Sequence, residues 1–362
     1  MIACQNSHTP LRRVAIVGSG LAGLVAARQL LESGVETTLF EKSRGPGGRM
    51  AAKRLPDPAS GSVDIGAQYF TVRNPAFRQF LDQYADEACW AEWQGRFRYQ
   101  NDEGEWQDLR PAHRYVGVPR MSAITRTISQ GLDVRAGVRI ATLQRDDRDL
   151  WQLTDTEGSR YGDYDAVVLT PPPAQTVDLL TDSGLSDVAD DLSIRISHMQ
   201  ACWTVVVHFP RGAGAGVEGL MPRSPILDWA ANNSSKPGRK DEGEWWVLHG
   251  APVWSDANID MDPDQVRGQL LEEFLRCSGV TGQPDDFLVH RWLYAKPRAS
   301  TAPGHLWFGD RNIALAGDWL DGGRVEGAFN SANDLVRRLE SEGLISGDLS
   351  PRQPPVGAGR SE

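Results

Sequence analysis

The sequence predicts an α/β protein in which a Rossmann-like domain is interleaved with a second, mainly antiparallel α+β domain. Glycine-rich turns stand between a strand-like and a helix-like run near the start of the chain, at residues 18–23, and near its end, at residues 317–332. Between them, short alternating apolar segments divided by polar turns are typical of antiparallel strands. We therefore expect the chain to leave the first domain, build the second and return.

The first glycine turn has the sequence GSGLAG. It follows the apolar run at residues 14–17 and opens a helix-like stretch at residues 21–31. Gly18 permits a tight turn, Gly20 lets a pyrophosphate approach the main chain, and Gly23 lets helix and strand pack closely. The free N–H groups at the start of this helix would bind the phosphates. The predicted contacts are Gly18, Ser19, Gly20, Leu21, Ala22 and Gly23.

An acidic residue ends the next strand-like run. Glu41 follows residues 37–40, where a carboxylate accepts hydrogen bonds from the adenosine ribose hydroxyls and disfavours a 2′-phosphate. Strand, glycine turn, helix and acid in this order predict a dinucleotide site, to which we assign Glu41 and its neighbour Lys42. This pattern alone does not separate NAD from FAD.

A second glycine motif, GGRM at residues 47–50, favours FAD. Its glycines permit close backbone approach, and the planar, permanently charged fork of Arg49 can hold a phosphate or a carboxylate. We expect Gly48, Arg49 and Met50 to contact the cofactor. The alternative is an ordinary glycine loop with a solvated arginine.

The segments that follow predict further strands and helices. DIGAQYF, at residues 64–70, precedes a helix that Asn74 and Pro75 open as N-cap and first residue. The run DAVVLTPPP predicts a strand that rejoins the first sheet and ends at its prolines. Other strands are predicted at residues 91–99, 106–109, 134–143 and 151–154, with a helix at residues 122–129.

The second half of the chain predicts a separate antiparallel sheet and then a return to the first one. The sheet would contain residues 201–209, 245–249 and 287–294, with a helix at residues 264–277, and residues 312–319 would form the returning parallel strand. The tail at residues 346–362 is expected to be disordered. The resulting division is an FAD-binding domain at residues 11–72, 121–180 and 300–345 and a substrate domain at residues 73–120 and 181–299.

The late glycine segment, GDWLDGGRVEGAFNSA, combines a strand end, a turn and a helix start. N–H groups at such a helix start would stabilise the negative charge of a reduced flavin. Asp318 could accept hydrogen bonds from ribityl hydroxyls or from water near the phosphates. Alternatively, Asp318 only caps the helix, and Glu326 only occupies its favourable first turn.

Charge and composition argue against several partners and sites. The formal net charge is −10 and lysine and arginine form no basic stripe, so nucleic acid is not expected. Residues 1–13 lack an apolar run of signal-peptide length, and no window approaches the roughly 20 apolar residues of a membrane span. We expect a cytoplasmic protein without a membrane partner. The 4 cysteines have no CxxC spacing, so neither a metal site nor a disulfide is expected, and the oligomeric state stays open.

Several motifs together resemble the bacterial branch of the renalase family, flavoproteins related to the amine oxidases. They are GSGLAG, FEKSRGPGGRM, DIGAQYF, VGVPRMSAIT, HRWLYAKP and AGDWLDGGRVEGA, spread over residues 14–339. The resemblance implies a noncovalent FAD in a fold of the p-hydroxybenzoate hydroxylase type. It also implies oxidation of 2-dihydro- and 6-dihydro-NAD(P) to NAD(P)⁺, with O2 reduced to hydrogen peroxide.

The resemblance also assigns residues. On the cofactor side it points to Ala22, Glu41, Arg49, Gln68, Tyr69, Val138, Asp318 and Glu326, and we include Gly317, Gly327 and Ala328 of the same late motif. On the substrate side it implies that Asn233 and His249 bind the carboxamide and that Trp292 forms an apolar wall. A satisfied core histidine and an ordinarily packed tryptophan are the alternatives for His249 and Trp292.

Two other functions stay open at this stage. The first is an amine oxidase that takes hydride from a small amine, although no cysteine for a covalent flavin link occurs in residues 317–332. Lys296 is the nearest candidate for the lysine that the wider amine oxidase group places near the flavin, and we favour a structural role for it. The second is a flavin-binding protein without turnover.

Overall fold

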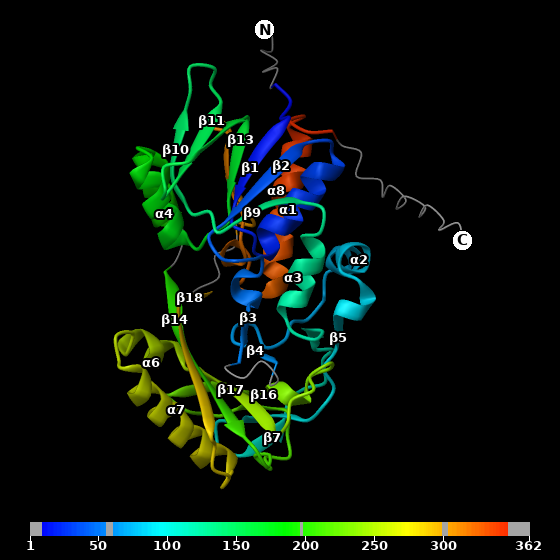
Figure 1. Ribbon diagram of the computed structural model, residues 1–362, viewed down its shortest axis with the longest axis vertical. Helices are drawn as coiled ribbons and strands as arrows, with labels where there is room; N and C mark the ends of the chain where they lie inside the picture. The colour runs from blue at the N-terminus through cyan, green and yellow to red at the C-terminus, as the bar shows by residue number, and fades with distance from the viewer. Residues whose placement is uncertain (1–8, 56–60, 196–197, 299–302, 347–362) are drawn as a thin grey trace, which may run out of the picture.

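Six strands form a mostly parallel sheet at one end of the molecule (Figure 1). The structure is a computed structural model that describes residues 9–55, 61–195, 198–298 and 303–346. The edge strand β19 runs antiparallel to its neighbour, whereas the other pairs are parallel. In spatial order the strands are β19 (Leu306–Phe308), β20 (Ile313–Leu315), β13 (Ala166–Leu169), β1 (Arg13–Val17), β2 (Glu36–Glu41) and β9 (Asp133–Ala136).

The two faces of this sheet are covered by different layers. Val14 and Ile16 of β1 pack into the core formed with α1 (Leu21–Glu32) and α8 (Val325–Ser341). The intervening residues of β1 face the opposite way, because successive side chains of a strand alternate between its faces. The elements on that side are β10 (Ile140–Arg145), β11 (Trp151–Asp155), β12 (Arg160–Tyr164), α4 (Pro173–Asp182) and α5 (Ser186–Arg195).

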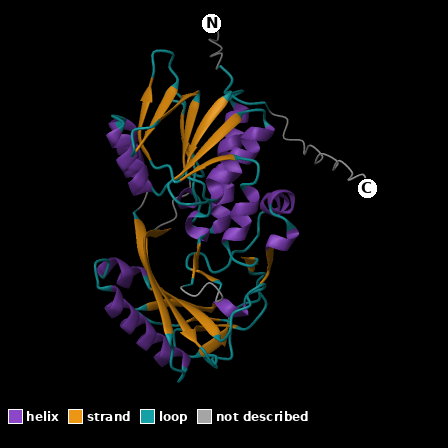
Figure 2. Ribbon diagram, viewed as in Figure 1, coloured by secondary structure: helices purple, strands orange, loops and turns teal. Residues whose placement is uncertain are grey.

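A seven-stranded sheet forms the other end of the molecule (Figure 2). Its pairs are antiparallel apart from β15 with β6. In spatial order the strands are β18 (Asp286–Pro297), β14 (Met199–Phe209), β17 (Glu244–Gly250), β16 (Leu227–Asn232), β15 (Gly219–Met221), β6 (Phe97–Gln100) and β7 (Trp106–Asp108).

One face of the seven-stranded sheet turns toward the first sheet. Its outer face packs against α7 (Pro263–Ser278), next to α6 (Pro252–Ala257). Its inner face packs against the hairpin of β3 (Ala52–Arg54) and β4 (Ser62–Asp64), which lies between the two sheets in Figure 1. This hairpin therefore connects the two layers at the centre of the molecule.

The remaining elements lie beside α1 and α8. They are α2 (Pro75–Tyr84), α3 (Ser122–Ile128) and the strand pair β5 (Trp90–Glu92) and β8 (Tyr115–Gly117). The Asn74 side chain accepts a hydrogen bond from Ala76 N at 3.0 Å, which confirms the predicted cap of α2. Four short 3-10 turns accompany the described residues of these elements, at Gly48–Met50, Glu87–Cys89, Asn233–Ser235 and Asp318–Leu320.

The predicted α/β class is confirmed, but two predicted strands are wrong in extent. Residues 91–99 divide between β5 and β6, which belong to different sheets, and residues 134–143 divide between β9 and β10. Gly95 (φ 154°) and Gly137 (φ 77°) stand at the two breaks, in backbone conformations that turn the chain away from a continuing ladder. The tail predicted to be disordered lies, after Ser346, outside the described residues.

Candidate functional site

The first glycine turn lies between β1 and α1 and leaves space at one position. Gly18 has φ 99°, and a Cβ on Gly23 would come within 2.1 Å of the Gly18 carbonyl oxygen. A Cβ on Gly20 would meet no atom within 4 Å. Gly20 is also the N-cap of α1, and no side chain caps this helix or places an acid in its first turn. Leu21 and Ala22 are buried in that turn, so the open side presents backbone N–H groups.

Glu41, at the end of β2, holds the same turn from the other side. Its carboxylate accepts hydrogen bonds from Ser19 N and Ser19 Oγ, both at 2.9 Å, and from Ser43 N at 2.8 Å. The side chain is buried. Glu41 therefore orders the glycine turn, in addition to lying at the predicted ribose position.

Two further residues assigned to the cofactor, Val138 and Lys42, lie beside Glu41. Val138 N donates to the Glu41 carbonyl at 2.9 Å, and the half-buried side chain of Val138 packs on the core below. Lys42 is exposed and its Nζ donates to Gln175 Oε1 at 2.9 Å. The lysine side chain is thus engaged with α4.

The second glycine motif lies directly against the first. A Cβ on Gly48 would be 3.4 Å from Gly20 Cα, and Gly47 N donates to Ser19 O at 3.2 Å. Gly48 is exposed with φ 50°, whereas Met50 is buried in the core. The two motifs form one continuous backbone surface.

Arg49 points to a protein carboxylate. Its Nη1 is 2.8 Å from Asp318 Oδ2, its Nη2 contacts the other oxygen, and Nη1 also lies 3.3 Å from Ala295 O. Burial raises the pKa of Asp318, and the charge of Arg49 offsets part of that rise. The sequence predicts a fork that can hold a phosphate or a carboxylate, and in the structure the carboxylate of Asp318 occupies it. The arginine joins the second glycine motif to the late one.

The late segment presents an unpaired donor beside a glycine. A Cβ on Gly317 would lie 2.3 Å from Trp319 Nε1, and that buried indole nitrogen has no hydrogen-bond partner among the described residues. Gly317 N donates to Ser331 Oγ at 2.9 Å. Gly327 packs closely as well, since its Cβ would meet Asp321 O at 2.1 Å, and Ala328 is buried beside it in α8.

Glu326 has a structural partner that the sequence did not indicate. Its Oε1 accepts hydrogen bonds from Arg73 N at 2.7 Å and Asn74 N at 2.5 Å, at the start of α2. The residue lies in the first turn of α8, as one of the two alternatives expected. Its carboxylate therefore connects α8 to α2.

Three side chains of the seven-stranded sheet converge on one carbonyl group. The Ile65 oxygen lies 3.2 Å from Thr204 Oγ1, 3.3 Å from His249 Nε2 and 3.0 Å from Trp292 Nε1, in β14, β17 and β18 respectively. Because a carbonyl only accepts, His249 must carry its hydrogen on Nε2. Burial lowers the pKa of His249 to about 4, although the hydrogen bond to Ile65 O acts to raise it. The ring is therefore neutral at physiological pH. The predicted pair His249 and Trp292 is thus brought together.

Asn233 bonds to the residue that precedes Ile65. Its Oδ1 accepts a hydrogen bond from Asp64 N at 3.2 Å, whereas His249 and Trp292 bond to the next residue, Ile65. Asn233 is fully buried, and its Nδ2 has no partner among the described residues. All three predicted substrate residues therefore bond to the backbone at the end of β4, although Asn233 bonds to a different residue from the other two.

The loop after β4 is fixed against the second glycine motif. Ala67 N donates to Arg49 O at 2.9 Å, and a Cβ on Gly66 would be 2.1 Å from the same oxygen. Gly66, Ala67 and Tyr69 are half-buried, whereas Gln68 is buried. Ile65, Gly66 and Ala67 thus continue the backbone surface begun by the two glycine motifs.

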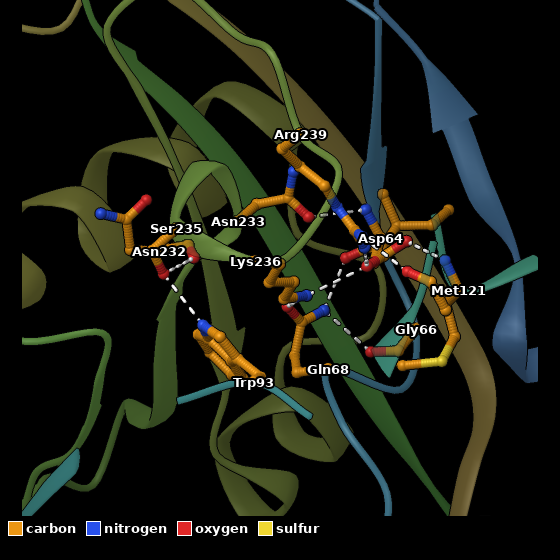
Figure 3. Close-up of polar contacts among 12 residues, drawn as sticks. Asp64, Gly66, Gln68, Trp93, Met121, Asn232, Asn233, Ser235, Lys236 and Arg239 are labelled. Carbon is orange, nitrogen blue, oxygen red and sulfur yellow. Dashed lines mark hydrogen bonds and ion pairs between the residues drawn. The ribbon is translucent and has the colours of Figure 1, made fainter. Parts of the chain in front are cut away.

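A buried charge cluster behind this loop was not predicted (Figure 3). Asp64 Oδ2 is 3.1 Å from Lys236 Nζ and also contacts Arg239 Nη2. Lys236 Nζ lies 3.0 Å from Gln68 Oε1. Burial alone would raise the pKa of Asp64, but the two cations hold it below its ordinary value; burial lowers the pKa of Lys236 to about 8. In the sequence these cations stand in a proline- and glycine-containing segment that resembles a solvated loop.

An aromatic group and an ion pair both involve residues of β16, Trp229 and Asp228. The Tyr69 ring is 5.7 Å from the ring of Trp229 and 6.5 Å from that of Trp93. Lys296 is half-exposed, and its Nζ lies 3.4 Å from Asp228 Oδ2. Among the described residues no cluster of histidine, cysteine, aspartate or glutamate could hold a metal ion.

These residues fit a bound dinucleotide. Gly20 leaves open space at an uncapped helix start, where N–H groups and the helix dipole favour phosphates. In the late segment, α8 also begins without a side-chain cap, and the buried N–H of Trp319 has no partner among the described residues. The distribution of free donors therefore matches an elongated, anionic cofactor.

Two sequence profiles match the chain. That of an NAD(P)-binding Rossmann-like domain covers residues 16–84, and that of flavin containing amine oxidoreductases covers residues 86–339. In the structure described, no helix is long and apolar enough to cross a membrane.

Curated relatives match only short segments. The chain is 44% identical over 61 residues to hydroxyneurosporene desaturase of Cereibacter sphaeroides, a match over 17% of this chain and 12% of the relative. It is 34% identical over 76 residues to tryptophan 2-monooxygenase of Agrobacterium tumefaciens, over 21% of this chain and 10% of the relative. These matches leave most of each relative uncovered.

Solved structures match the fold over most of the chain. A putative protoporphyrinogen oxidase from Exiguobacterium superimposes with a TM-score of 0.72 at 15% identity, over 92% of this chain and 100% of that one. Cyclohexylamine oxidase from Brevibacterium oxydans gives a TM-score of 0.67 at 11% identity, over 92% and 99%. Putrescine oxidase bound to putrescine gives 0.66 at 12% identity, over 92% and 100%.

Proposed function

We propose a specific oxidase activity on the premise that the chain belongs to the family of flavin-containing amine oxidoreductases, binds FAD and is a flavin-dependent oxidoreductase. The proposed substrates are 2-dihydro- and 6-dihydro-NAD(P), which would be oxidised to NAD(P)⁺ while O2 is reduced to hydrogen peroxide. Bound FAD would supply the hydride acceptor and the route of electrons to O2. The protein would supply binding, orientation and a suitable electrostatic environment.

The observation that carries this proposal is the neutral polar group around the Ile65 carbonyl. His249 is uncharged above about pH 4 because of its burial, and Trp292 lies beside it on the same oxygen. With Nε2 donating to Ile65, the Nδ1 of His249 is an acceptor for the N–H of a carboxamide. The Nδ2 of Asn233, which has no partner among the residues the structure describes, would donate to the carboxamide oxygen. Such a group suits an uncharged dihydropyridine ring that bears a carboxamide.

For a dihydropyridine, the protein needs little acid or base chemistry. Loss of hydride restores aromaticity, so the main tasks are to stack the ring, orient its carboxamide and prevent misplacement. Trp292 would form the apolar wall and His249 with Asn233 would set the orientation. The flavin, held by the cofactor residues assigned from the sequence, would face this group.

A small amine is the alternative substrate, and the family itself favours it. Structural neighbours include putrescine oxidase and cyclohexylamine oxidase. The rings of Tyr69, Trp93 and Trp229 could contribute to an aromatic cage for a cation. Against this, the Asp228 carboxylate near His249 is paired with Lys296 and is therefore not a free counter-ion. A flavin-binding protein without turnover is a further alternative.

Anaerobic mixing with candidate reductants separates these functions. The FAD-loaded protein is mixed with 6-dihydro-NAD, 2-dihydro-NAD, ordinary NADH, putrescine and cyclohexylamine, and flavin bleaching is followed. We expect fast bleaching by at least one isomer and slow or no bleaching by NADH, which presents its hydride at a different ring carbon. Bleaching by an amine alone would establish the amine oxidase, and bleaching by none of them would favour the binding protein.

We also propose the domain division derived from the sequence. The strands support it: those of the six-stranded sheet fall within residues 11–72, 121–180 and 300–345, and those of the seven-stranded sheet within residues 73–120 and 181–299. The helices α2 and α5 depart from it, because they belong to the second set of ranges but pack against the first sheet and its helices. The boundary at residue 300 lies outside the described residues. A cytoplasmic location stays a prediction from the sequence.

A further inference from the structure

The buried cluster behind the Ile65–Tyr69 loop combines two cations with one carboxylate. The side chains of Lys236 and Asp64 have no exposed surface, and that of Arg239 is 1% exposed. Both cations contact the same oxygen of Asp64, while Met121 N donates to the other oxygen at 2.7 Å. Lys236 Nζ also lies 5.3 Å from the centre of the Trp93 ring. The ammonium group is thus enclosed by protein on several sides.

The surrounding charges do not give Lys236 a carboxylate of its own. Asp64 is shared with Arg239, and Arg120 adds a third positive charge within electrostatic range of it. Asp241 is the other acid close to Arg239, but it accepts a hydrogen bond from Ser234 Oγ at 2.9 Å and burial raises its pKa. Since a buried ion pair can often be replaced by apolar residues without loss of stability, folding alone gives little reason for this lysine.

Gln68 connects Lys236 to the loop that faces the predicted cofactor. Its Nε2 donates to Asp64 O at 2.5 Å and to Gly66 O at 3.0 Å, and its Oε1 accepts from Lys236. An ammonium group can only donate, so it fixes which end of the amide faces it and directs the NH2 group to the loop carbonyls. Lys236 therefore orients the amide that donates to Asp64 O and Gly66 O at the start of the 65–69 loop (Figure 3).

The other surface of this loop lies against the second glycine motif, which is predicted to contact the cofactor. Ala67 N bonds to Arg49 O, and Arg49 is paired with Asp318. Gly48 lies so near Gly20 that a Cβ added to Gly48 would be 3.4 Å from Gly20 Cα. A displacement of the loop would therefore be transmitted to the glycine motifs. Gln68 connects Lys236 to this loop, because it bonds to Lys236 Nζ and to Gly66 O.

We propose that Lys236 is a positioning residue for bound FAD: it acts through Gln68 to fix the 65–69 loop and places a buried positive charge behind it. Without the ammonium group, the Gln68 oxygen would lose its donor and the amide would be free to turn, so the loop carbonyls would lose their partners. A positive charge close to a redox group also favours its reduced, more negative form. This inference rests on FAD binding along the loop and does not depend on the identity of the substrate.

The first test compares Lys236→Met with a matched control, Arg145→Met. Arg145 is paired with Asp149 and lies 5.0 Å over the Trp151 ring, in the three-stranded sheet away from the loop. For Lys236→Met we expect an FAD dissociation constant at least about tenfold higher, a lower flavin midpoint potential and an altered visible flavin spectrum. Arg145→Met should leave all three unchanged. If both variants change only thermal stability, Lys236 is merely structural and the proposal is wrong.

A second test uses Gln68→Leu and the double variant. If Lys236 acts through Gln68, the shift of midpoint potential in Lys236→Met/Gln68→Leu is smaller than the sum of the two single shifts. Additive shifts would overturn that route. Gln68→Leu also keeps the buried charges, so it tests the loop if Lys236→Met does not fold. These measurements use no substrate, so a failure of the dihydro-NAD(P) assay would not affect them.

Discussion

Arg49 and Asp318, 269 residues apart in sequence, form a two-point ion pair that joins the early and late glycine motifs. Arg49 leaves the 3-10 turn of GGRM, and Asp318 follows β20 at the end of the parallel sheet. Asp318 is buried, so its charge depends on this partner. Because of this pair, a change in the position of one glycine motif is expected to shift the other.

Replacing Arg49 by alanine should weaken both the fold and FAD binding. The buried carboxylate of Asp318 would lose its partner, at a cost of about 2–3 kcal/mol in the free energy of unfolding. Urea unfolding of the apo-protein and FAD titration measure the two effects. Arg49→Lys is the control, because it keeps the charge but not the two-point contact. Wild-type FAD affinity in Arg49→Ala would contradict the dependence.

Two glycines of the same motif should respond differently to alanine. Gly23→Ala would place its Cβ 2.1 Å from Gly18 O, so we expect a loss of about 2 kcal/mol or more in the apo-protein. Gly20→Ala meets no atom within 4 Å and has an ordinary φ of −70°, so the apo-protein should keep its melting temperature. Its methyl group would fill the space proposed for phosphate, so FAD binding should fall. If Gly20→Ala bound FAD with normal affinity, the phosphate could not lie at this position.

His249→Ala should slow flavin reduction by a dihydropyridine isomer by about tenfold, the value of one hydrogen bond. Rapid mixing under anaerobic conditions measures the rate. The control Thr204→Val removes another donor to Ile65 O and keeps the side-chain shape, so it shows how much of the effect comes from the loop. An unchanged rate in His249→Ala would exclude the role assigned to it.

The pH dependence of reduction should contain no histidine step near pH 6.5. Burial lowers the pKa of His249 to about 4 in the folded protein, so the ring stays neutral through the range in which a free histidine titrates. The same shift means that the stability this group contributes is present above pH 6.5 and is lost as the pH falls toward 4. A reduction rate that falls with an apparent pKa of 6–7 and loses this step in His249→Ala would contradict the neutral ring.

The apo-protein should gain stability from Lys236 as the pH rises above 8. Its pKa is about 8 in the folded protein and 10.5 when unfolded, so between these values the unfolded chain holds the additional proton. The free energy of unfolding then increases with pH over this window. Urea midpoints from pH 7.5 to 10 test this, and Lys236→Met should lose that part of the slope. Equal slopes of unfolding free energy against pH in the two proteins would mean that the pKa of Lys236 is not lowered by folding.

The local structure of the glycine turn could be predicted because its signals are local. The turn at Gly18–Gly23 needs particular residues at fixed spacing, and Glu41 ends the next strand at the expected place; the cofactor contacts assigned to these residues stay a prediction. The Asn74 cap of α2 is local too. By contrast, the strands predicted at residues 91–99 and 134–143 failed because apolar alternation does not reveal which sheet a strand joins. Glycines at residues 95 and 137 redirect the chain there.

The fold class, the glycine turn after β1 and the relation to FAD-binding amine oxidoreductases could be read from the chain alone, because they depend on short-range spacing and on motifs that match as a whole. Tertiary structure alone decided that Arg49 binds Asp318, that His249 and Trp292 meet at Ile65 O, and that Lys236 and Arg239 share Asp64. Each of these contacts joins segments more than 170 residues apart. A pattern along the chain gives no distance between such segments, whereas burial of charged and polar groups requires partners that only folding brings together.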